Sequence, residues 1–135
     1  MQINIPFTLD VTRHTHVHQY MTARQGDSNV YRLGLTITNG GRKLAVPDGA
    51  AAELKCIRPD GALVTSDGSV MADGTIKIAV PTRALTAVGI VFCEVNISDD
   101  TSAFTTETFD IRVEPTVIGE KEIDETDYDG GLILF

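Results

Sequence analysis

Apolar and polar residues alternate along most of the chain. In residues 3–11, and again in residues 30–38, apolar side chains occupy every second position and mostly polar ones lie between them. A period of two is typical of strands that bury one face in a core. Segments with the same pattern, rich in Thr, Val and Ile, follow at residues 50–58, 63–65, 69–71, 75–80, 89–98, 103–107 and 109–114. The pattern therefore predicts a protein built from short strands.

Turn signals separate these segments. Asn or Asp followed by Gly supplies the positive φ angles that tight hairpins require. The turns predicted in this way are Asn39-Gly40-Gly41, Asp48-Gly49, Pro59-Asp60-Gly61, Asp67-Gly68 and Asp73-Gly74. One segment, residues 81–87, begins with a proline suited to a first helical turn and is followed by Gly89, which predicts a short helix.

Many short strands, frequent turns and a single short helix favour an all-β fold. We expect an immunoglobulin-like antiparallel β-sandwich, with the helix of residues 81–87 as a crossover between sheets and with a C-terminal extension. The chain contains no Trp, so it lacks the Cys…Trp…Cys core of antibody domains.

The alternation fades after Pro115, and the charge changes at the same place. The chain of 135 residues has the size of one domain, and we place the β-sandwich domain in residues 1–117. Residues 118–135 are predicted to form an acidic flexible arm that ends in an apolar segment. Residues 120–135 hold six acidic residues and one lysine, so most of the net charge of −8 lies in this arm.

The charge distribution also limits the partners. Neither part of the chain offers the basic face that displaces counterions from phosphates, so we expect neither nucleic acid nor an anionic membrane as a partner. No apolar run approaches the roughly 20 residues of a membrane span. The first residues lack the features of a signal peptide, which predicts synthesis and assembly in the cytoplasm.

The arm ends in four consecutive apolar residues, Leu132, Ile133, Leu134 and Phe135, after Gly130-Gly131. Left exposed, such a segment would promote aggregation. It could fold back as a strand on its own domain, or it could insert into a neighbouring subunit by strand addition or at a trimer axis. In the second case these four residues are the candidate partner-binding residues, and we expect a homo-oligomer such as a trimer.

Residues for catalysis are scarce. All three histidines, His14, His16 and His18, lie within one short stretch, so no distant histidine can complete a triad. No phosphate-binding, dinucleotide-binding, zinc-protease or nucleophile-elbow motif occurs. We therefore expect a non-enzymatic protein with no catalytic residue and no cofactor.

The same histidines are the metal-ligand candidates that stand out in the sequence. In an extended segment, His14, His16 and His18 would project from one face and could present nitrogens to a metal ion. One strand cannot surround an ion by itself, and a polar edge strand explains the same residues. We therefore expect no metal site.

The two cysteines, Cys56 and Cys93, match no zinc-binding or redox spacing. Each lies on the apolar side of its alternating segment. Free buried thiols are the favoured interpretation, because a cytoplasmic product stays reduced, and an inter-sheet disulfide is the alternative.

Five short motifs occur in a fixed order along the chain. They are Thr8-Leu9-Asp10-Val11-Thr12, Thr22-Ala23-Arg24-Gln25-Gly26-Asp27, residues 31–38 followed by Asn39-Gly40, Arg58-Pro59-Asp60-Gly61, and Thr108-Phe109-Asp110-Ile111-Arg112-Val113-Glu114. In this order and spacing, residues 7–115 resemble the N-terminal domain of phage baseplate upper proteins. Arg24 and Arg58 stand where that family usually has Lys, so the charge is kept.

The resemblance implies a β-sandwich found in virion proteins of phages that infect Gram-positive bacteria. It implies a structural protein of the tail or baseplate, an adaptor that docks on other virion proteins such as tail hub, baseplate or capsid subunits, assembled in the host cytoplasm. The family's stalk and receptor-binding head have no counterpart in the sequence. A capsid decoration protein of the same fold is therefore one alternative, and a carbohydrate-binding or cell-surface-binding module that uses Tyr20, Tyr31 or Tyr128 is another.

Overall fold

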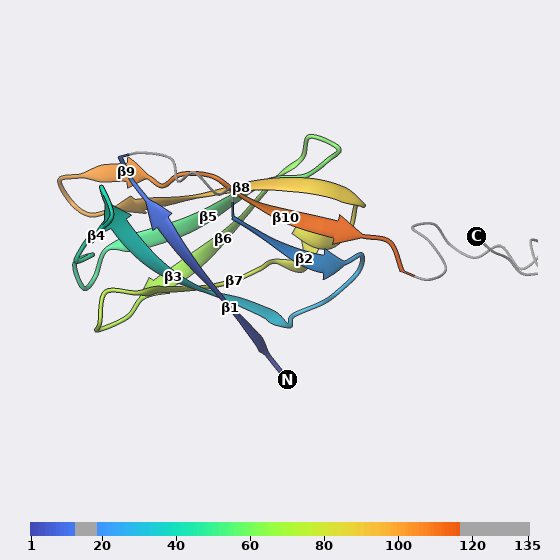
Figure 1. Ribbon diagram of the computed structural model, residues 1–135, viewed down its shortest axis with the longest axis horizontal. Coiled ribbons are helices and arrows are strands. Elements are labelled where there is room, and N and C mark those ends of the chain that lie inside the picture. Colours follow the sequence, from blue (N-terminus) through green and yellow to red (C-terminus); the bar gives the residue numbers. More distant parts are fainter. Residues whose placement is uncertain (13–18, 117–135) are drawn as a thin grey trace, which may run out of the picture.

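The computed structural model describes residues 1–12 and 19–116, and almost all of its regular structure is β-strand (Figure 1). Its elements are β1 (Ile3–Asp10), β2 (Tyr20–Arg24), β3 (Tyr31–Asn39), β4 (Arg42–Lys43), β5 (Ala51–Ile57), β6 (Leu63–Val70), β7 (Ile76–Ala79), the 3-10 helix η1 (Thr82–Leu85), β8 (Gly89–Ser98), β9 (Ala103–Thr105) and β10 (Phe109–Glu114). The predicted all-β class with one short helix is confirmed.

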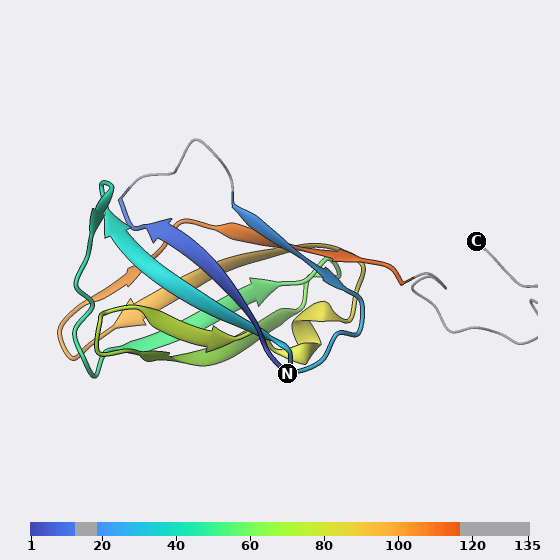
Figure 2. The ribbon, with the colours of Figure 1, turned by 60° about the horizontal axis from the view of Figure 1, so that its bottom comes forward.

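The strands form one continuous sheet in the order β1-β3-β7-β6-β5-β8-β10-β2, with β4 beside β3 and β9 beside β8. The sheet curls into a near-barrel, so the two layers expected of a sandwich are two halves of the same sheet (Figure 2). The division between a domain of residues 1–117 and an arm of residues 118–135 stays a prediction, because residues 117–135 lie outside the described part.

The antiparallel expectation is met except at the two ends of the sheet. There β1 pairs with β3, and β2 pairs with β10, in parallel. The reason is that β2 pairs with β10 and does not lie between β1 and β3. Because β2 runs opposite to β1, the next strand, β3, runs in the same direction as β1 and pairs with it in parallel. The immunoglobulin-like part of the prediction is not confirmed by this strand order.

Contacts between the first strand and the last part of the sheet draw the barrel together. The rings of Phe7 and Phe109 lie with their centroids 4.7 Å apart. The backbone N–H of Asp10 donates to the Glu107 carboxylate over 2.8 Å, and the N–H of Glu107 donates to the carbonyl of Asp10 over 2.9 Å. The side-chain amide of Gln19 pairs with both backbone groups of Thr8. These bonds occupy the outer edge of β1, which is otherwise open to another strand.

The core is filled by the alternating apolar positions that the sequence predicts. Leu33, Leu35 and Ile37 of β3 are buried, as are Leu54 of β5 and Val91 of β8. Burial of such side chains supplies the main stabilising free energy of a domain of this size. No helix within residues 1–12 and 19–116 has the length and apolar character needed to span a membrane.

Cys56 and Cys93 are both free and buried, as the favoured interpretation has it. They lie opposite each other on the neighbouring strands β5 and β8, with their sulfur atoms 3.5 Å apart. The hydrogen bond with Cys56, together with burial, raises the pKa of the Cys93 thiol. Both side chains are part of the core, and a thiol with a raised pKa is a poor nucleophile.

The prediction of a turn at Asp67-Gly68 is wrong, because both residues lie inside β6. Gly68 pairs with Ala52 of β5 and with Ile78 of β7, so β6 is shared between two neighbours at this position. A Cβ atom on Gly68 would lie 2.3 Å from Cγ1 of Ile78 and 3.0 Å from the backbone oxygen of Lys77. Glycine is needed here for close approach between strands and not for a turn.

Replacing Gly68 by Ala should destabilise the domain by about 1–3 kcal/mol, because the added methyl group has no space beside Ile78. Gly34→Ala in β3 is the matched control, since its Cβ would meet no atom within 4 Å. Urea unfolding of the two variants measures the difference. Equal midpoints for both would contradict the close-approach explanation.

Candidate protein-docking surface

Four exposed apolar side chains lie together on the outer face of the barrel. They are Leu63 of β6, Ile57 of β5, and Phe92 and Ile90 of β8, with exposed fractions of 58%, 43%, 56% and 44%. In the strand register Ile57 lies opposite both Leu63 and Phe92. We call these four residues the outer patch. A contiguous apolar surface of this kind is typical of an interaction site.

Local breaks in the alternation produce the outer patch. At the end of β5, apolar Cys56 points inward and apolar Ile57 points outward, where the same face earlier in the strand carries Glu53 and Lys55. In β8 the run Ile90-Val91-Phe92-Cys93 is apolar on both faces. In the sequence, adjacent apolar residues within a half-buried strand mark these positions. Only the strand register shows that Ile57 of β5 and Phe92 of β8 lie side by side.

Polar side chains border the outer patch. Arg112 of β10 lies opposite Ile90, and its guanidinium carbon is 3.6 Å from the centroid of the Tyr20 ring. This geometry is a cation–π contact. Lys55 precedes Ile57 by two residues on the same face of β5 and lies opposite Glu94. An apolar centre with a polar border is the common composition of protein interfaces.

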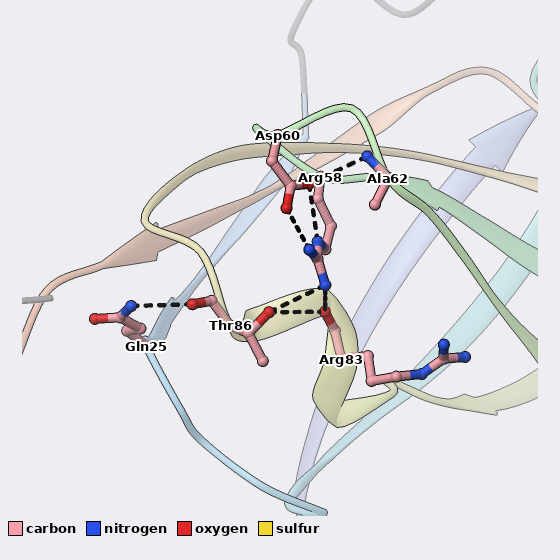
Figure 3. Close-up of polar contacts among 6 residues, drawn as sticks. All are labelled: Gln25, Arg58, Asp60, Ala62, Arg83 and Thr86. Carbon is pink, nitrogen blue, oxygen red and sulfur yellow. Dashed lines mark hydrogen bonds and ion pairs between the residues drawn. The ribbon is translucent and has the colours of Figure 1, made fainter. Parts of the chain in front are cut away.

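The hairpin that joins β5 to β6 is held against η1 by Arg58 (Figure 3). Its Nη1 donates to the carbonyl of Arg83 over 3.1 Å and to the hydroxyl of Thr86 over 3.2 Å, while its Nε donates to the Asp60 carboxylate over 3.0 Å. Gln25 donates to the carbonyl of Thr86. Two of the sequence motifs therefore meet beside η1. Arg58 fixes the hairpin. The residues that flank this hairpin, Ile57 at the end of β5 and Leu63 at the start of β6, belong to the outer patch.

The first motif has a structural task at the other end of the barrel. The Asp10 carboxylate accepts hydrogen bonds from the N–H and hydroxyl of Thr12, the hydroxyl of Thr38 and the N–H of Gly41. It thereby ties the end of β1 to the turn after β3. In the second motif, Asp27 accepts a hydrogen bond from the Tyr31 hydroxyl. Burial, together with this hydrogen bond, raises the pKa of Tyr31 to about 12.

Two sets of residues singled out in the sequence lie outside the described residues. These are His14, His16 and His18, and the segment of Leu132, Ile133, Leu134 and Phe135. Within residues 1–12 and 19–116, no group of three or more His, Cys, Asp or Glu side chains could hold a metal ion. The outer patch is the site that sequence reasoning missed.

A small curled sheet with an apolar patch on its outer face has the features of a protein-interaction module. Comparison with known families gives a specific assignment. The model of the BppU N-terminal domain matches residues 3–131, and the chain belongs to this baseplate upper protein family. The predicted resemblance is confirmed, and membership supports a structural role in the phage virion.

A solved structure has the same fold. The N-terminal domain of phage TP901-1 ORF48 aligns with a TM-score of 0.60 and 18% sequence identity, covering 82% of this chain and 98% of that one. The search of curated proteins gave no match.

The Arg58–Asp60 contact predicts an acid-shifted titration. Hydrogen bonding to Arg58, with a further bond from the N–H of Ala62, lowers the pKa of Asp60 to about 2. A lowered folded-state pKa means that the stabilisation is complete above about pH 4, the ordinary value for Asp, and is lost as the pH falls toward 2. Arg58→Gln should raise the pKa of Asp60 toward its ordinary value, as measured by NMR titration of the carboxyl carbon.

Asp99 is the internal control for this titration. Backbone N–H groups of Thr101 and Ser102 lower its pKa, so the Arg58→Gln exchange should leave it unchanged. An Asp60 titration that is the same with and without the guanidinium would show that the Arg58 contact does not set its pKa.

Proposed function

We propose that this chain is an adaptor-type component of the phage tail or baseplate that docks on neighbouring virion subunits. The single observation that carries the proposal is the outer patch, four apolar side chains from three adjacent strands on the surface of a member of the baseplate upper protein family. Leu132, Ile133, Leu134 and Phe135 are the proposed partner-binding residues of the same chain. Its partners are other virion proteins and further copies of itself.

The framework behind the outer patch suits a docking role. Arg58 binds η1 and Asp60 at the same time, so the hairpin that carries Ile57 and Leu63 is held in one position. A surface that is ordered before binding loses less conformational entropy when a partner docks. The core position of Cys56 and Cys93 and the scaffold roles of Asp10 and Asp27 fit a structural task as well.

Two observations argue against the carbohydrate-binding alternative. The Arg112 guanidinium covers one face of the Tyr20 ring, where a sugar would stack. The Tyr31 hydroxyl is bonded to Asp27, and the residue is partly buried. The third polar aromatic residue, Tyr128, lies outside the described residues.

Gold-labelled antibodies against this chain, applied to phage particles from the source lysate, locate it by electron microscopy. We expect label at the distal end of the tail. Label over the head would contradict the tail location and support the capsid-decoration alternative. Particles without label, in a lysate where the chain is detected by immunoblot, would contradict the virion role altogether.

A further inference from the structure

The outer patch has a chemical counterpart in the same chain. It consists of Leu, Ile and Phe side chains only, and residues 132–135 are Leu-Ile-Leu-Phe. We propose that the outer patch of one copy binds residues 132–135 of a second copy. This inference rests on the proposed function, because it names the surface on which neighbouring copies dock.

The described chain ends beside the outer patch. Arg112 lies opposite Ile90, and β10 ends two residues later at Glu114. Both ribbon views show the end of β10 at the same end of the barrel as the hairpin between β5 and β6 (Figures 1 and 2). At roughly 3.3 Å per residue, residues 117–131 can span up to about 50 Å. A stretch of that length would allow the apolar segment to contact a second copy.

Charge favours a second copy over the chain's own patch as the binding site. Six acidic residues and one lysine stand between residue 119 and residue 130. Charged linkers of one sign repel themselves and extend, so the proposal expects the apolar segment to meet another copy sooner than its own barrel. On the receiving copy, Arg112 borders the outer patch beside Ile90 and offers positive charge to the acidic residues that precede the segment. Lys55 lies opposite Glu94, so that pair adds no net charge to the border.

Binding on the face explains the apolar segment better than addition to a strand edge. The edge of β1 is occupied at Thr8 by Gln19 and at Asp10 by Glu107, and Pro6 has no N–H to offer. At β2, Asp27 bonds both backbone groups of Arg24. Strand addition would also turn two of the four side chains away from the protein, whereas an apolar face can accept more of them.

Sedimentation velocity of the full-length chain over a concentration series tests the proposal. We expect the wild-type chain to self-associate. Phe92→Asp should weaken this association by roughly 30-fold or more, because it places a charge at the centre of the outer patch. Replacing residues 132–135 by four serines should have the same effect. Met71→Asp, at an exposed apolar residue directly after the far end of β6, is the matched control and should associate like the wild type.

Mixing two variants gives the sharper test. The Phe92→Asp chain keeps its apolar segment, and the four-serine chain keeps its outer patch. Each should be monomeric alone, and a mixture should form a one-to-one heterodimer, because one complete pair of surfaces is restored. Leu63→Asp serves as a second patch variant if Phe92→Asp fails to fold, as judged by circular dichroism.

Three results would overturn the proposal. A monomeric wild-type chain would mean that the segment binds its own barrel or not at all. Association lost with four serines but kept in Phe92→Asp and Leu63→Asp would place the segment elsewhere, for example on the edge of β2. Association lost only in the patch variants would indicate patch-to-patch packing. Because the purified chain is measured, these results are independent of where antibodies label the particle.

Discussion

Among the described residues, the strands at the two ends of this curled sheet, β1 and β2, each have one edge without a neighbouring strand. The backbone N–H and C=O groups along these edges must be hydrogen-bonded or shielded, and the rest of the structure depends on this constraint. Gln19 occupies the backbone groups of Thr8, and Glu107 exchanges two hydrogen bonds with Asp10, so the edge of β1 is closed at its C-terminal half. Edges that remain open promote uncontrolled association between sheets. With this half of β1 protected, the outer patch offers a face for association, and association through a face can be specific.

The motifs that mark the family and the residues proposed to bind partners are different sets. Asp10, Asp27 and Arg58 come from the motifs, and each holds a turn or a chain crossing in place. Ile57, Leu63 and Phe92 lie outside them or at their borders and point outward. The motifs therefore identify the fold, while the choice of partner depends on side chains that the fold presents.

Local patterns predicted the all-β class, most strand segments and the burial of both cysteines, because each depends on alternation within one segment. They missed β2, whose five residues place only Met21 and Ala23 inward. They assigned Gly68 to a turn, because its role depends on Ile78 of another strand. The parallel pairs and the outer patch also escaped prediction, since Ile57, Leu63 and Phe92 become neighbours only through strand pairing.

The proposed docking role makes the outer patch the contact surface of this domain in the particle. Hydroxyl-radical footprinting, read by mass spectrometry, can compare the chain in intact particles with the purified chain below its association range. We expect Phe92 and Leu63 to lose reactivity in the particle while exposed Met71 keeps it. Equal reactivity of Phe92 and Leu63 in both states would contradict it.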